Sequence, residues 1–390
     1  MNERMKITIS SCLVFLAIIW SLFVPSTIFE LLGLPGFAIS LLVMVLTLII
    51  CLCVTVHKKI IFIIVGVFSF SFILLFKWGD MRYIISPISI SLSFLIISLF
   101  NQNGLRSFLN FSSYFLLLIL IGCWFGFSLS LATGGAEIKL FNVFGRDYYF
   151  YLTTFTVVKN NEFIRPSGIY LEPGHLIWIL ASLLCIRRIY EKNLRLTVTL
   201  LILGFITFSL AYIIFSVFFI LSLLNIRNAV LTILIGVLSF SIIIFSPLGE
   251  YSKQYIYERF ESTDGGEAIK GDNRSFRMVN AYEILANDPS VLITGIGAKC
   301  YFEPDSCRSE IGLYGENPLT PLVGLGIFNS FIYYYMLLAV LVLSIRNRRI
   351  SVMMAIGITA IYAQQPINLQ LGYSFWPLLL LHNMRNRNIL

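Results

Sequence analysis

The run IIFIIVGVFSFSFILLF, from Ile60 to Phe76, contains no charged residue and directly follows the pair Lys58-Lys59. A helix needs about 20 apolar residues to cross a bilayer, and about 17 can suffice. Only helices and closed barrels satisfy their backbone groups in lipid, and this run lacks the polar and apolar alternation of a barrel strand. It therefore predicts a membrane-spanning helix.

Similar runs recur along the chain, and the composition agrees with them. Of the 390 residues, 58% are apolar and 12% are charged, whereas soluble proteins carry about 25% charged residues. The apolar runs are Ile7–Val24, Leu34–Val56, Ile60–Phe76, Tyr83–Phe100, Phe108–Leu131, Leu176–Ile186, Leu196–Leu224, Ala229–Ser246, Leu319–Ile345, Ile350–Ala363 and Leu371–Leu381. We expect an all-α polytopic membrane protein in which residues 1–390 form one membrane domain.

The run Leu196–Leu224 is too long for one ordinary span and too short for two full ones. We expect two short helices that turn near Phe208, which brings the total to about twelve transmembrane helices. Short clusters of Lys and Arg occupy every second gap between the runs, as the positive-inside rule requires. This pattern predicts that both termini, together with Arg188, Arg227 and Arg348, are cytoplasmic. The net charge of +8 then reflects topology rather than nucleic-acid binding.

Two long polar segments, residues 132–171 and 247–318, fall on the other side of the membrane in this topology. The second mixes acidic and basic residues, and its part Arg274–Asn287 has apolar residues at loosely helical spacing. We expect a short amphipathic helix there, lying on the membrane surface.

Cysteine and histidine usage argues for one disulfide and against a metal. Cys300 and Cys307 are the only cysteines in a polar loop, and an oxidising compartment would favour a disulfide between them. The three histidines are far apart in the sequence, and no metal-binding motif is present. The motifs Gly295-Ile-Gly297 and Gly324-Leu-Gly326 lack the rest of a nucleotide fingerprint, so we interpret them as turn or close-packing glycines.

The candidate site is the stretch RPSGIYLEPGH, from Arg165 to His175, just before an apolar run. Pro173 is suited to the first position of the following helix, which places Glu172 at the N-cap. The helix dipole and the free N–H groups there stabilise a carboxylate as the anion. Glu172 can then act as a proton acceptor, or it can be only a cap with Arg165 as its counter-ion.

Arginines provide the other candidate chemistry. Arg165, Arg274 and Arg277 all lie in the long polar segments, and Arg274 and Arg277 are three residues apart on the expected helix. A planar guanidinium binds two oxygens of a diphosphate at once. The alternative is that these are ordinary solvated loop arginines.

These elements resemble a known family. The pattern Arg165-x-x-Gly168-x-x-x-Glu172-Pro173, followed by Arg274, Asp288-Pro289 and Gly295-Ile-Gly297, is similar to that of the Wzy-type O-antigen and polysaccharide polymerases and the related O-antigen ligases. The resemblance covers the topology of the whole chain and the motifs of its second half. In the ligases a His-Asn pair precedes a late span, whereas this chain has Glu316-Asn317-Pro318, which favours polymerase over ligase.

The resemblance implies a metal-independent glycosyltransferase without a cofactor at the periplasmic face of the bacterial inner membrane. It would join undecaprenyl-diphosphate-linked oligosaccharides, and a chain-length regulator protein is a candidate partner. The guanidinium groups would bind the diphosphate, and Glu172, His175 or Glu316 would act as base. Tyr170 and Asn317 would contact sugars, with an anchor at the membrane interface as the alternative role of Tyr170. The alternatives are an O-antigen ligase, a lipid-linked oligosaccharide flippase or other transporter, and a structural assembly partner. Against a flippase stands the scarcity of charged residues within the spans.

Overall fold

The structure is a computed structural model that describes residues 3–31, 36–53, 58–133, 137–143, 146–151, 156–160, 163–190, 194–223, 273–302, 307, 312, 315, 317–346, 351–367 and 369–386. Glu316, Arg227, Arg348 and the run Ala229–Ser246 lie outside these residues. For Arg165 and Arg274 the backbone is described but the side chain is not.

Helices form most of the described chain, and most of them coincide with the apolar runs. The first half contains α1 (Glu3–Ile18), the π-helix η1 (Ile19–Phe23), α2 (Ile28–Leu31), α3 (Gly36–Cys53), α4 (Lys58–Trp78), η2 (Met81–Ile84), α5 (Ile85–Leu99) and α6 (Gln102–Thr133). The second half contains α7 (Pro173–Tyr190), α8 (Arg195–Leu203), η3 (Gly204–Thr207), α9 (Leu210–Leu223), α12 (Asn273–Asn287), α13 (Ser290–Thr294), α14 (Ala298–Phe302), α16 (Thr320–Arg346), α17 (Val352–Gln364) and α18 (Phe375–Asn386). The helices α12, α13 and α14 lie instead in the polar segment 247–318.

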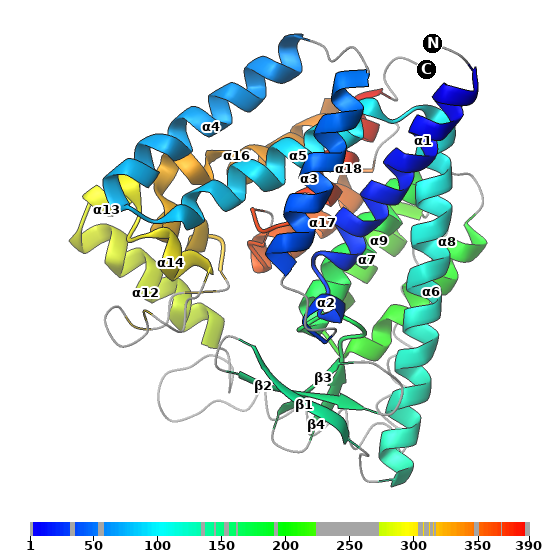
Figure 1. The fold of residues 1–390 in the computed structure, drawn as a ribbon. Helices are drawn as coiled ribbons and strands as arrows, with labels where there is room; N and C mark the ends of the chain where they lie inside the picture. The colour runs from blue at the N-terminus through cyan, green and yellow to red at the C-terminus, as the bar shows by residue number, and fades with distance from the viewer. Residues whose placement is uncertain are drawn as a thin grey trace, which may run out of the picture.

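Three helical segments in the described part are long and apolar enough to cross a membrane: Met81–Leu99, Gln102–Leu129 and Thr320–Arg346. Several further apolar helices are shorter, α3, α9 and α17 among them. The chain is therefore a membrane protein, while the number of twelve spans stays a prediction. Both termini lie at one end of the helical body, and the strands lie at the opposite end (Figure 1).

The run Leu196–Leu224 is divided where the sequence predicts. Phe208 separates η3 from α9 and adopts left-handed backbone angles, φ 49° and ψ 36°. This conformation ends a helix, because a residue with positive φ cannot continue a right-handed helix. The hydroxyl of Tyr212 on α9 donates to the carbonyl of Leu201 on α8 at 2.9 Å, which fastens the two short helices together.

The segment 132–171 is not simply a loop, and here the all-α prediction is incomplete. It contains a four-stranded antiparallel sheet in the order β1-β2-β3-β4, with strands Glu137–Val143, Arg146–Tyr151, Thr156–Asn160 and Phe163–Pro166. The strands are short and rich in Tyr, Phe, Val and Ile, which favour pleated structure. A search for long apolar runs detects spans, and it misses strands of this length.

Serine side chains join the helices within the body. The hydroxyl groups of Ser89 and Ser93 on α5 each lie 2.7 Å from that of Ser374, just before α18. The indole N–H of Trp20 on η1 donates to Ser93 at 2.8 Å. All four side chains are buried. Such hydrogen bonds help to hold the helices together, because hydrophobic burial contributes little to the association of helices in lipid.

The two Gly-x-Gly motifs pack against each other. α16 is interrupted at Gly326, whose φ is 70° and ψ 173°. Ile296 and Gly297 donate their N–H groups to the carbonyls of Val323 and Gly324, at 2.8 and 3.1 Å. In a regular helix these carbonyls would accept from the N–H groups of residues four positions later within α16. Ile296 and Gly297 therefore replace hydrogen bonds that the interruption of α16 removes.

Side chains are excluded at this junction. A Cβ atom on Gly295 would lie 2.4 Å from the carbonyl oxygen of Gly324, and one on Gly326 would lie 2.4 Å from that of Ile293. Both glycines also have positive φ, a conformation that favours glycine. The interpretation of these motifs as close-packing glycines agrees with the structure, and the close contact is between the two motifs.

The expected amphipathic helix is α12, which begins one residue earlier than predicted. It turns apolar side chains outward: Phe276 and Val279 are each 53% exposed and Tyr282 is 67% exposed. Arg277 and Ala281 face the protein instead and are buried. An outward apolar face is what a helix at a membrane surface presents.

Candidate functional site

The stretch Arg165–His175 folds as a strand, a turn and a helix. Arg165 lies on β4, paired with Val158 of β3. The N–H of Tyr170 then donates to the carbonyl of Ser167 at 3.2 Å, which closes a turn at Gly168. Gly168 has a φ of 64°, and a Cβ atom there would lie 2.6 Å from the side chain of Ile119 on α6. The turn and the packing on α6 therefore both favour glycine.

α7 begins at Pro173, so Glu172 is in the predicted N-cap position. The N–H groups of His175 and Leu176 donate to the carbonyl of Glu172 at 3.0 and 3.5 Å. Glu172 and His175 are both half-buried. Glu172 thus lies at the positive end of the helix dipole, which stabilises a carboxylate anion.

An aromatic cluster surrounds the start of α7. The ring of Tyr373 lies edge-on to those of His175 and Trp178, with centroids 5.3 and 5.6 Å apart. The hydroxyl of Tyr373 donates to the carbonyl of Pro25 at 3.2 Å.

Tyr170 does not have the exposed position expected of a residue that stacks on a sugar. Its side chain is fully buried in the core, next to the turn that leads into α7. The sequence indicated an aromatic residue near the membrane edge but contained no signal for its burial depth.

The second group of predicted residues lies where α12 meets the start of α16. Asn317 donates its side-chain N–H to the carbonyl of Arg277 at 3.2 Å, and its side-chain oxygen accepts from the N–H of Leu319 at 2.8 Å. Its backbone N–H donates to the hydroxyl of Thr320 at 3.1 Å. Asn317 is therefore a buried capping residue that fastens α12 to α16, and its role as a sugar ligand stays a prediction. Arg277 is 9% exposed.

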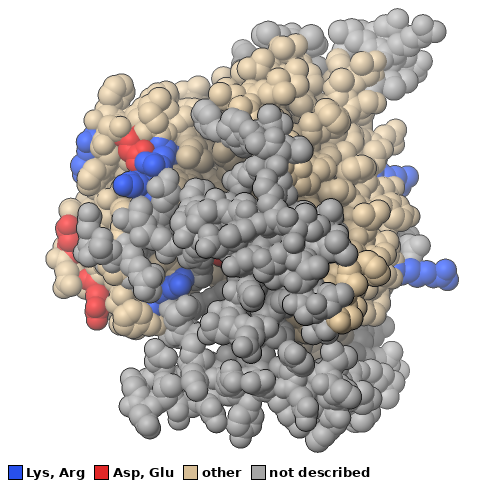
Figure 2. Space-filling view, turned by 60° about the horizontal axis from the view of Figure 1, so that its bottom comes forward, with Lys and Arg blue, Asp and Glu red and all other residues tan. Residues whose placement is uncertain are grey.

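Asp288, in the Asp288-Pro289 motif, also has a structural role. Its carboxylate accepts from the N–H and the hydroxyl of Ser290, at 3.0 and 2.7 Å, at the start of α13. These hydrogen bonds lower the pKa of Asp288. Charged side chains gather on the α12–α14 flank of this end of the molecule, whereas the rest of the described surface there is largely uncharged (Figure 2).

The two groups lie on different sets of helices. α12 packs on α13 and α16, whereas α7 packs on α17 and α18. The segment between α17 and α18 contacts both α14 and α7: the hydroxyl of Tyr301 on α14 donates to the carbonyl of Pro366, and the side chain of Gln365 lies against Gly174 on α7. No sequence motif marks this segment, because its position depends on the tertiary fold.

No protein family, curated protein or solved structure matches the chain. Among the described residues, no three His, Cys, Asp or Glu side chains gather in a way that would hold a metal ion.

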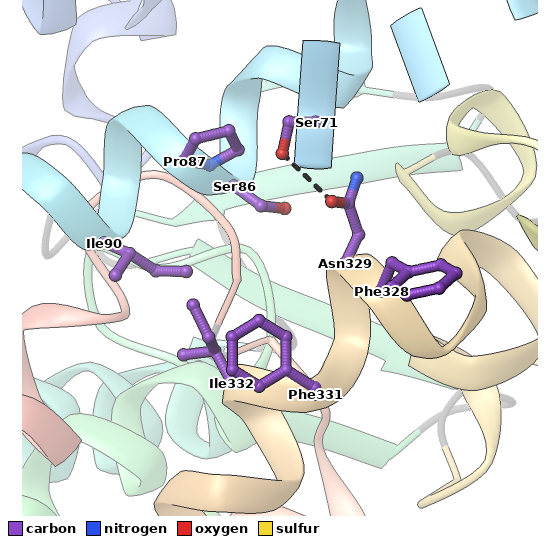
Figure 3. Close-up of a pocket in the computed structure, with 8 residues that line it drawn as sticks. All are labelled: Ser71, Ser86, Pro87, Ile90, Phe328, Asn329, Phe331 and Ile332. Carbon is purple, nitrogen blue, oxygen red and sulfur yellow. Dashed lines mark hydrogen bonds between the residues drawn. The ribbon is translucent and has the colours of Figure 1, made fainter. Parts of the chain in front are cut away.

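A recess elsewhere in the fold is lined by Ser71 of α4, the start of α5 and the part of α16 around Asn329 (Figure 3). The hydroxyl of Ser71 donates to the side-chain oxygen of Asn329 at 2.9 Å. The recess has a volume of about 10 Å³, far below the roughly 300 Å³ at which ligand pockets begin. None of the predicted site residues lines it.

Cys300 and Cys307 are joined by a disulfide, with their Cα atoms 5.5 Å apart. By loop-closure entropy the bond should stabilise the fold by about 2 to 3 kcal/mol. We expect the double variant Cys300→Ser/Cys307→Ser to unfold at lower temperature than the parent protein. Mass spectrometry of the non-reduced protein should find the two cysteines in one cross-linked peptide pair, and recovery of both as alkylated thiols would contradict the assignment.

Proposed function

We propose that the chain is a membrane glycosyltransferase that polymerises undecaprenyl-diphosphate-linked oligosaccharides, as the sequence resemblance implies. The observation that supports this best is the junction of β4 and α7. There Arg165 is on the strand, Gly168 makes the turn and Glu172 occupies the N-cap. The two charged residues of the motif are thus attached to regular elements at the end of the molecule away from the termini (Figure 1).

The proposed reaction forms one glycosidic bond and breaks another. A hydroxyl of the acceptor glycan attacks C1 of the donor sugar, and the bond from C1 to the diphosphate oxygen breaks. Arg165, Arg274 and Arg277 neutralise the negative charge that develops on the leaving diphosphate. Glu172, His175 or Glu316 accepts the proton of the attacking hydroxyl. The products are a longer lipid-linked glycan and undecaprenyl diphosphate.

We also propose the topology that this reaction requires. Twelve helices cross the bacterial inner membrane, both termini are cytoplasmic, and residues 132–171 and 247–318 are periplasmic. The placement of the termini and the sheet at opposite ends of the helical body supports this arrangement (Figure 1). A chain-length regulator is the expected protein partner.

The proposal is tested with purified protein in proteoliposomes. The substrate is the lipid-linked oligosaccharide pool extracted from cells in which the gene is deleted. We expect lipid-linked products of two, three and more repeat units, with one undecaprenyl diphosphate released for each bond formed. A preparation that leaves single-repeat units unchanged would contradict the proposal.

Two other outcomes identify the alternatives. An O-antigen ligase would transfer glycan to an added lipid A–core acceptor and form no lipid-linked ladder. A flippase would move the lipid-linked units across the bilayer without any new covalent product. Accessibility of the glycan to an impermeant lectin, measured beside the product ladder, separates the three activities.

A further inference from the structure

Gln365 lies directly on the first turn of α7. It follows the last residue of α17 and is 9% exposed. A Cβ atom on Gly174 would be 1.7 Å from the side-chain nitrogen of Gln365, 2.4 Å from Cδ and 2.6 Å from Oε1. The amide group therefore rests on the backbone of Gly174, between Glu172 and His175 in the sequence, and the missing side chain of Gly174 makes room for it.

Three buried polar atoms near this turn have no hydrogen-bond partner within the described chain: Oε1 of Gln365, the hydroxyl of Tyr170 and the indole nitrogen of Trp178. An unsatisfied buried polar group costs about 1 to 3 kcal/mol of stability. Most buried polar side chains form hydrogen bonds, so three unsatisfied polar atoms near the start of one helix need an explanation. A ligand that supplies the missing hydrogen bonds would explain them.

The chemistry of the three groups defines the ligand. An amide oxygen accepts, an indole N–H donates, and a hydroxyl does either. None of the three is charged, so they suit a neutral ligand that carries several hydroxyl groups. The rings of Tyr373 and Trp178 pack edge-on to each other beside these groups, with centroids 5.6 Å apart. This set matches a sugar, whereas guanidinium groups suit the diphosphate.

We propose that Gln365 binds a hydroxyl group of the glycan at the start of α7, next to Glu172. The proposal rests on the proposed function, which supplies a glycan substrate for this site. Gln365 would thus fix the position of the sugar relative to the carboxylate of Glu172. Gly174 contributes by leaving the space that the amide group occupies.

The test compares Gln365→Leu with Gln364→Leu, a matched change at the adjacent glutamine. Binding of the extracted lipid-linked oligosaccharide pool is measured in nanodiscs, beside the thermal unfolding temperature of each variant. We expect Gln365→Leu to weaken binding about tenfold, the value of one lost hydrogen bond. Its unfolding temperature should stay equal or rise, because Leu removes an unsatisfied buried oxygen. Gln364→Leu should bind as the parent does.

Gly174→Ala provides a second route to the same result, because the added Cβ displaces the amide of Gln365 without removing it. It should weaken binding to a similar extent. Unchanged binding in Gln365→Leu would overturn the inference, and so would weaker binding with a lowered unfolding temperature, which indicates a structural role or an ordered water. A parent protein that does not bind the pool would also overturn it. Parent protein that binds but makes no ladder contradicts the polymerase proposal alone.

Discussion

Replacing Arg277 with Ala should lower the rate of polymer formation about thirty- to a thousand-fold while the protein still reaches the membrane. Each charge-assisted contact to the leaving diphosphate in a dry site contributes about 2 to 4 kcal/mol to the transition state, which corresponds to that range of rates. Arg165→Ala and Arg274→Ala should behave in the same way. Lys at these positions should restore only part of the rate, since it keeps the charge but loses the bidentate fork.

The length of the lipid-linked ladder on a gel measures this effect, with membrane abundance measured in parallel. Lys299→Ala is the control, because Lys299 is an exposed cation on α14 in the same polar segment. It should leave the ladder unchanged. Normal ladders from Arg165→Ala and Arg274→Ala at normal abundance would show that these arginines do not bind the diphosphate.

Glu172→Gln should reduce polymer formation by a factor of about 100 or more, if the carboxylate is the base or pairs with a catalytic arginine. Gln has nearly the same size, and its amide oxygen retains a weaker cap for α7. Loss of the cap alone costs about 1 kcal/mol of stability and does not remove a proton acceptor.

Asp288→Asn is the matched control for Glu172→Gln. Asp288 is an exposed carboxylate that accepts hydrogen bonds at the start of α13, so this change removes a charged cap and nothing else that the mechanism uses. We expect a small loss of stability and a normal ladder. If Glu172→Gln is equally mild, Glu172 is only a cap and the base is another residue.

The sequence predicted the start or the end of a helix correctly where a few neighbouring residues determine it. Pro173 set the first residue of α7, and the length of the run Leu196–Leu224 required a break, which the structure has at Phe208. The helix α12 followed from the spacing of its apolar residues. In each case the signal lies within one segment and needs no tertiary contact.

The sequence contained no signal where the position of a side chain depends on residues far apart in the chain. Asn317 reads as a polar residue in a loop, and only its contact with Arg277 shows that it joins two helices. Gln365 ends an apolar helix, and its place against Gly174 follows from the packing of α17 on α7. The burial of Tyr170 likewise depends on the surrounding helices.

The paired Gly-x-Gly motifs have a consequence for how this sequence can vary. Gly295 and Gly326 each occupy space that a side chain on the other would require, and the backbone bonds between the two segments depend on both. A larger residue at either position separates the segments and removes the close contact that excludes a side chain at the other. In an alignment of related chains, the two positions should therefore change together, and this covariation would identify the interrupted α16 without a structure.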